Sequence, residues 1–181
     1  MANTWFSITV ELVEGRDLSF WPRPGRIFAA SAAHSFGDLS RAIDPAFARW
    51  DLSHLHEFRL ADETLIGEID PRLDQPEELV DEDATKLKVL SVGDRFLYVY
   101  DLGDGWHHLC SVAKEKIDPV ETLGIAPKEP MAYWGWGEIP DQYGRRWNGD
   151  DGESFLPQDP KKTDLPPFFP WWGEGASDYP S

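Results

Sequence analysis

The sequence has almost no cysteine, few basic residues and no long apolar run. The one cysteine, Cys110, excludes an internal disulfide framework and fits a reducing compartment. No stretch is long enough to span a bilayer, and the first residues lack the basic and apolar regions of a signal peptide. The sequence therefore predicts a soluble cytoplasmic protein that does not bind membranes.

Positive charge is also scarce. Lys and Arg total 17 against 33 Asp and Glu, for a formal net charge of -16. The densest basic spots, Arg145-Arg146 and Lys161-Lys162, are flanked by acids. A field of this sign repels phosphate backbones, so direct binding of nucleic acid is not expected. The charge indicates either a role in solubility alone or attraction to a basic protein or a cationic ligand, so a basic protein or a small-molecule ligand is the expected partner.

The common catalytic motifs are missing as well. The sequence has no G-x-S-x-G, no phosphate-binding loop and no G-x-G-x-x-G. Cys110 lies inside a predicted strand, where a cysteine usually behaves as a small buried apolar residue. No nucleophile can therefore be assigned from the sequence.

The patterns that are present predict an α+β fold. Apolar and polar residues alternate over residues 5–12, 54–60, 95–101 and 106–113, as in half-buried strands, and residues 64–69 are a further candidate strand. A helix begins after Ser35, with Asp38 in its first turn, and a break or kink is expected at Pro45, where Asp44 could cap a final turn. Residues 70–83 read as an acidic solvated loop, and residues 85–92 as a short helix or turn. We expect an antiparallel β-sheet with one or two helices packed on it.

The amino-acid composition of the chain changes near residue 118. Residues 1–117 are predicted to be the α+β core domain, and residues 118–181 an irregular Pro/Trp-rich extension wrapped on that core. Its segment FFPWWGEG, residues 168–175, is too apolar to remain exposed. We expect this segment to dock on the core or on a second subunit, which makes a homodimer one expectation.

The stretch YVYDLGDGWHHL, residues 98–109, reads as a β-hairpin around Asp104-Gly105. A two-residue turn would place Asp101 opposite His108, and a four-residue loop would place it opposite Trp106. Both registers put Asp101, Trp106 and His108 on one apolar face and His107 on the other. Asp101 and His108 are therefore either a structural pair or a catalytic acid–base pair.

A second histidine cluster, SHLHEF, lies on the strand that begins at His54. His54 and His56 share one face of this strand and Glu57 takes the other. If Asp101 and His108 converge on the two histidines, the four residues could bind a divalent metal such as zinc. Trp134, Trp136 and Trp147 could then wall a pocket. The candidate ligand-binding residues are His54, His56, Glu57, Trp106, Trp134 and Trp136.

The paired motifs SHLHEF and RFLYVYDLGDGWHH make the chain resemble the plasmid pRiA ORF-three-like family, small bacterial proteins often carried on plasmids and transposons. The resemblance covers roughly residues 5–115. Where the family shows P-P-E-D-x-G-G, this chain has GEIPDQYGRRWNGDDG, with Pro140, Asp141 and Gly144 as possible counterparts. The resemblance implies an α+β fold with an antiparallel sheet and supplies no reaction.

Three functions are compatible with these patterns. The first is a non-catalytic binding or interaction module with an acidic, aromatic-rich surface. The second is a metal-dependent enzyme, such as a hydrolase, with a His/Asp site on the sheet. The third is an accessory protein of a mobile genetic element, which rests on the family context alone.

Overall fold

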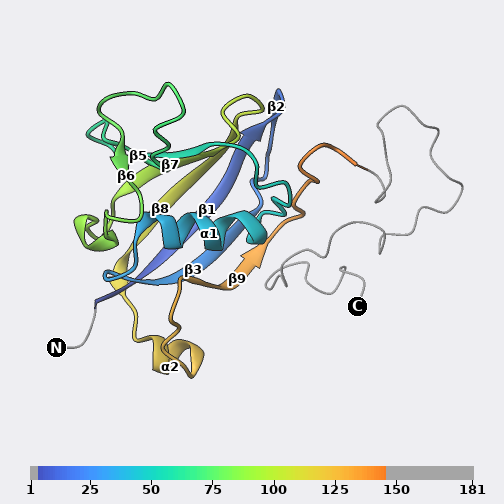
Figure 1. Cartoon of the computed structure of the whole chain (residues 1–181). Coiled ribbons are helices and arrows are strands. Elements are labelled where there is room, and N and C mark those ends of the chain that lie inside the picture. The colour runs from blue at the N-terminus through green and yellow to red at the C-terminus, as the bar shows by residue number, and fades with distance from the viewer. Residues whose placement is uncertain (1–3, 146–181) are drawn as a thin grey trace, which may run out of the picture.

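A twisted β-sheet organises the structure, a computed structural model that describes residues 4–145 (Figure 1). In the described residues the sheet has nine strands, in the order β6-β5-β4-β7-β8-β1-β3-β9, and β2 pairs with β1 beside this path. The strands are β1 (Trp5–Gly15), β2 (Leu18–Ser19), β3 (Gly25–Ser31), β4 (His56–Arg59), β5 (Leu65–Gly67), β6 (Val80–Asp81), β7 (Arg95–Tyr100), β8 (Trp106–Lys116) and β9 (Met131–Trp136).

The sheet is mixed rather than purely antiparallel. β5 and β6 pair in parallel, whereas the other strand pairs are antiparallel. The helices are few: α1 (Phe36–Ala46), α2 (Pro119–Leu123) and the short 3-10 helix η1 (Leu87–Val89). The α+β class is therefore confirmed in outline, and the wholly antiparallel sheet is corrected. No described helix has the length and apolarity needed to cross a membrane.

Helix α1 packs across one face of the sheet (Figure 1). Its start follows from a capping box, in which Ser35 accepts a hydrogen bond from the Asp38 N–H and the Asp38 carboxylate accepts one from the Ser35 N–H. Phe36, Leu39 and Ile43 recur at helical spacing and are fully buried against the strands. This face of α1 closes the hydrophobic core.

The end of α1 differs in detail from the prediction. The helix continues through Pro45 to Ala46, and the N–H groups of Phe47 and Arg49 bond to the carbonyl of Asp44. Asp44 therefore does not cap a second helix. Instead its side chain is buried beneath the last turn of α1.

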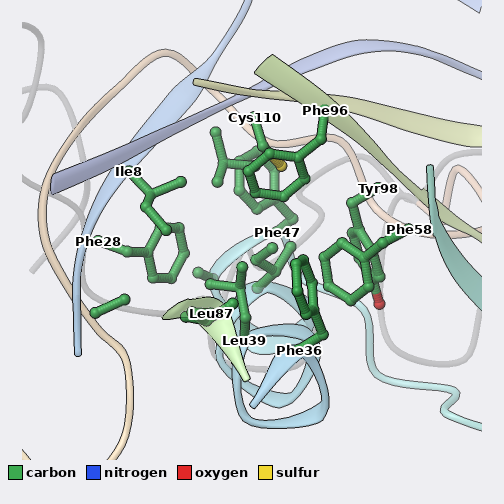
Figure 2. Packing of buried hydrophobic residues seen from close by; sticks show 14 of the residues in the cluster. Ile8, Phe28, Phe36, Leu39, Phe47, Phe58, Leu87, Phe96, Tyr98 and Cys110 are labelled. Carbon is green, nitrogen blue, oxygen red and sulfur yellow. The ribbon is translucent and has the colours of Figure 1, made fainter. Parts of the chain in front are cut away.

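Aromatic residues fill the core between α1 and the sheet. Figure 2 shows rings from the helix facing rings from β4 and β7 across this layer. Phe36 lies edge-on to Phe58, with ring centroids 5.1 Å apart. Cys110 is buried in the same layer, and burial raises the pKa of its thiol. The labelled members are Ile8, Phe28, Phe36, Leu39, Phe47, Phe58, Leu87, Phe96, Tyr98 and Cys110.

The chain after residue 117 contributes to the same sheet. β9 pairs antiparallel with β3, so the predicted boundary falls between two strands of one sheet, β8 and β9. β9 was not foreseen within the irregular extension. The segment FFPWWGEG and Trp147 lie outside the described residues.

The hairpin between β7 and β8 has a different register from both predicted ones. Tyr100 pairs with Trp106 and Tyr98 with His108, which leaves a five-residue loop, residues 101–105. An odd loop reverses the parity, so Tyr98 and Tyr100, not Asp101, share a face with Trp106 and His108. The predicted pairing of Asp101 with His108 is therefore wrong.

Asp101 itself is the cause of this register. Its backbone is left-handed, with φ of 56°, and its Oδ1 accepts hydrogen bonds from the N–H groups of Gly103 and Asp104. Its carbonyl accepts a third bond from Gly105 at 2.7 Å. An aspartate that turns the chain in this way ends the strand one residue early.

Candidate functional site

Polar side chains interrupt the apolar core beneath the C-terminal end of α1. They come from α1 and the residue stretch just after it, from β4, β7 and β8, and from the segment after β6. We call them the buried polar cluster: Asp44, Arg49, His56, Glu82, Tyr98, Trp106 and His108.

Asp44 and Tyr98 form the centre of the buried polar cluster. The Tyr98 hydroxyl donates to Asp44 Oδ1 at 2.6 Å, and Tyr98 is fully buried. Burial raises the pKa of Asp44 to about 6, although the bond from Tyr98 acts in the opposite direction. Burial and the Asp44 charge together raise the pKa of Tyr98. The tyrosine is therefore a permanent donor to this carboxyl group.

His56 and Glu82 form a second pair in the buried polar cluster. His56 Nε2 lies 2.7 Å from Glu82 Oε2, and both side chains are largely shielded from solvent. Burial alone would lower the pKa of His56, but the hydrogen bond and charge of Glu82 raise it. Glu82 lies within residues 70–83, the acidic segment predicted to be a solvated loop, and it is buried instead.

Arg49 is the unusual member of the buried polar cluster. Its guanidinium stacks on the ring of Trp106, 3.8 Å from the ring centroid, and only 3% of the residue is exposed. None of its three guanidinium nitrogens hydrogen-bonds to a described residue. Burial lowers the pKa of Arg49 to about 10, so the group stays charged at neutral pH. Within residues 4–145, the N–H groups of this buried cation therefore have no hydrogen-bond acceptor.

His108 is buried beside this cation. Its Nδ1 lies 3.2 Å from the carbonyl oxygen of Tyr98, and its ring lies edge-on to Phe47. Burial, followed by the charge of Arg49, lowers the pKa of His108 to about 3. The imidazole is therefore neutral at physiological pH. Nε2 of His108 and Nε1 of Trp106 are buried and also lack hydrogen-bond partners in the part of the chain that the structure describes.

His54 and Asp101 meet at the edge of the site. His54 Nδ1 lies 3.2 Å from Asp101 Oδ2, and His54 Nε2 lies 2.6 Å from the Tyr143 hydroxyl. That hydroxyl donates to Asp51 Oδ2, also at 2.6 Å. His54 thus connects the hairpin loop to the segment after β9, which we call the strap (residues 137–145).

The strap lies against the loop that follows α1, as the orange segment beside that loop in Figure 1 shows. Fully buried Gln142 accepts hydrogen bonds from the N–H groups of Trp50 and Asp51 and donates one to the Asp51 carbonyl. Asp141 accepts a bond from Trp50 Nε1 and holds the guanidinium of Arg145. The strap is therefore attached next to Arg49 by these hydrogen bonds and by ring contacts with Trp50, and its Ile139 is buried in the hydrophobic core.

The four predicted metal ligands do not form one group. His54 and Asp101 lie together, His56 pairs with Glu82, and His108 lies among aromatic rings. Within residues 4–145, no set of three or more His, Cys, Asp or Glu side chains could hold a metal ion.

The other predicted ligand-binding residues are dispersed. Glu57 bonds to Arg59 on the outer face of β4. Trp134 and Trp136 lie on β9, three strands from β8 in the sheet order, and Trp134 is 48% exposed. Trp136 donates from Nε1 to the carbonyl of Arg23. Of the predicted set, only His56, Trp106 and His108 belong to the buried polar cluster.

Asp44, Arg49, Glu82 and Tyr98 were not foreseen as site residues. A signal for one of them existed in the run FARW, where Arg49 stands between two aromatic residues. A charged residue in such a run either faces solvent or is buried because it has a partner. The sequence alone does not distinguish these cases.

Comparison with known proteins places the chain in a family. The family described as Plasmid pRiA4b ORF-3-like protein matches residues 6–140. The chain belongs to this family. A comparison with curated proteins gave no significant match.

One solved structure similar to this chain of the pRiA4b ORF-3-like family is the crystal structure of a protein of unknown function, MM3350, from Methanosarcina mazei Go1. The similarity has a TM-score of 0.60 at 21% sequence identity and covers 78% of this chain and 74% of that one. At this identity the similarity shows a common fold, and it assigns no reaction.

Proposed function

We propose that the protein is a non-catalytic binding module that holds a negatively charged ligand at Arg49. The observation that carries this proposal is the set of three guanidinium nitrogens that are buried without hydrogen-bond partners. Each buried polar group left unpaired costs about 1–3 kcal/mol, and a charged group costs more. A protein that keeps such a group in its core has a ligand or ordered water for it.

The chemistry around Arg49 favours an anion from outside the chain. The protein contains 33 acidic residues, yet no described carboxylate lies within ion-pair distance of Arg49. The charge of Asp44 acts on Arg49, but this carboxyl group accepts a hydrogen bond from Tyr98 at Oδ1 and forms no ion pair with Arg49 among the described residues. Asp141 is committed to Arg145 and Trp50 in the same way. The cation is therefore desolvated without being paired.

Access to Arg49 requires part of the protein to move, because the guanidinium nitrogens are closed off from solvent. We infer that the strap is this part, because it bonds to Trp50 and Asp51, which follow Arg49 in the chain. The contacts of Gln142, Tyr143 and Asp141 with the loop after α1 are hydrogen bonds that water can replace. Such contacts separate at lower cost than a packed apolar interface. Ile139 holds the start of the strap in the hydrophobic core, so the part from Asp141 onward, which is attached to the loop after α1 mainly by hydrogen bonds, is the part suited to opening for a ligand.

The remaining chemistry of the cluster supports binding rather than catalysis. The His108 imidazole is neutral and buried, and the Cys110 thiol has a raised pKa, so neither group is poised to transfer a proton or attack a substrate near pH 7. His56 is already hydrogen-bonded to Glu82. Among the described residues, Arg49 is the charged group in this cluster that has hydrogen-bonding capacity left for a ligand, and the neutral Trp106 and His108 each keep one unpaired nitrogen beside it.

The test is thermal unfolding with a panel of formate, acetate, glycolate, phosphate and sulfate. At least one anion should raise the Tm of the wild-type protein by about 5 °C or more at saturation, because it binds only the folded state. Arg49→Met should abolish this shift. The variant itself should be as stable as the wild type or more stable, since it removes an unpaired buried charge.

Arg59→Met provides the matched control, because Arg59 is exposed on the outer face of β4 and bonds only to Glu57 among the described residues. This variant should keep the full anion response. A wild-type protein that responds to no anion, or an Arg49→Met protein that responds as strongly as the wild type, would refute the proposed function.

A further inference from the structure

We propose that the ligand is a small monocarboxylate that carries a hydroxyl or other hydrogen-bond donor next to its carboxylate. This inference rests on the proposed function and names its ligand class. It follows from the unpaired polar atoms of Arg49, Trp106 and His108, taken together as one recognition surface.

The stacked guanidinium selects a planar carboxylate. Because one face of Arg49 lies on the Trp106 ring, its N–H groups point outward along the edges of the guanidinium plane. A forked edge of this kind matches the two oxygens of a carboxylate in a bidentate pair. Trp106 Nε1–H is a further unpaired donor that a carboxylate oxygen can accept from.

The surrounding charges favour a single negative charge on the ligand. Asp44 and Asp141 both act electrostatically on Arg49, so the positive potential at the site is already reduced. A dianion such as hydrogen phosphate would bring one more negative charge than Arg49 can neutralise, close to the Asp44 carboxyl group. A monoanion fits this balance better.

His108 supplies the complementary acceptor. The carbonyl of Tyr98 can only accept, so the proton of the neutral imidazole is on Nδ1, and Nε2 carries a lone pair. This lone pair is buried and has no donor. A bare carboxylate offers it no hydrogen, whereas a hydroxyl group next to the carboxylate does. The donor and acceptor pattern thus matches a hydroxy acid better than a simple fatty acid.

The closed environment limits the size of the ligand. The His108 ring lies against the rings of Phe47 and Tyr98, the Arg49 guanidinium lies over the Trp106 ring, and the unpaired nitrogens of all three residues are buried. A close-packed interior of this kind admits a ligand of few heavy atoms when the strap opens. Glycolate and acetate differ by one hydroxyl group and are therefore suitable probes.

Isothermal titration calorimetry of the full chain at about pH 7.5, where His108 is neutral, tests the inference. Glycolate should bind about 10-fold more tightly than acetate, the effect of one added hydrogen bond to a buried acceptor. Phosphate should bind more weakly than either. His108→Leu should reduce the preference for glycolate over acetate to about 1-fold while acetate binding persists.

His107→Leu is the matched control, since His107 is the next residue of β8 and lies on the opposite face of the sheet. It should keep the full preference for glycolate. Equal binding of glycolate and acetate, or tighter binding of phosphate, would overturn the ligand class and leave anion binding at Arg49 intact. Absence of binding for all probes would instead refute the proposed function.

Discussion

Replacing Tyr98 with phenylalanine is expected to lower the free energy of unfolding by about 3 kcal/mol near neutral pH. The substitution keeps the ring and its packing against Phe58 and removes only the hydroxyl that donates to Asp44 at 2.6 Å. The Asp44 carboxyl group would then be buried without this donor. Urea unfolding followed by fluorescence measures the change.

The pH dependence of this loss identifies its cause. The bond from Tyr98 favours the ionised form of Asp44, whose pKa in the folded protein is about 6. The Tyr98→Phe substitution should therefore cost more at about pH 8, where the carboxyl group is ionised, than at about pH 5. An equal loss at both pH values would show that packing, not the hydrogen bond, explains the effect.

Tyr133→Phe is the control for the loss of a tyrosine hydroxyl. Tyr133 lies on β9 and hydrogen-bonds to Ser7 in a partly buried neutral pair, with a distance of 2.8 Å. Its replacement should cost about 1 kcal/mol or less at either pH. Asp44→Asn combined with Tyr98→Phe should be less damaging than the sum of the two single changes.

The elements with strong local signals were predictable from the sequence. The alternation of residues 5–12 and the capping box at Ser35 act within a few residues, and both β1 and the start of α1 form as expected. The edge strand β9 was missed because proline and glycine surround it, so its pattern is short and irregular. It becomes a strand because β3 provides a partner, and this is tertiary information.

The arrangement of the site was less predictable. Asp101, Trp106 and His108 stood out in the sequence, but the hairpin register depended on whether Asp101 adopts a left-handed backbone. A shift of one residue in a hairpin exchanges the two faces of a strand. That exchange brought Tyr98 to the side of His108 and Asp101 to His54.

The burial of Arg49 shows a second limit of prediction from the sequence. A lone arginine after a helix usually faces solvent in a protein with excess acid, where many carboxylates could pair with it. Its burial on Trp106 depends on where α1 ends relative to β8. The periodicity of residues near Pro45 leaves that position uncertain by one or two residues.

Replacing His108 with leucine is expected to remove a large part of the loss of folding stability that occurs as the pH falls. Its pKa is about 3 in the folded protein, below the ordinary value of 6.5 that applies when the chain unfolds. Between these values the unfolded state binds a proton that the native state does not, so stability falls as the pH falls. Relative to His108→Leu, the wild type should lose about 3 kcal/mol between pH 7.5 and 4.5.

Wild type must be compared with His108→Leu because protonation of Asp44 changes the stability of the protein in the opposite direction. Its pKa is raised to about 6 from 3.8, so its native state binds the extra proton and gains stability as the pH falls through this range. The two effects partly cancel in the wild type, and only the difference between wild type and His108→Leu isolates the histidine. His107→Leu, on the opposite face of β8, should follow the wild-type pH profile. If His108→Leu follows that profile as well, His108 is not buried in its neutral form, and the hydrogen-bond acceptor assigned to the ligand site is lost with it.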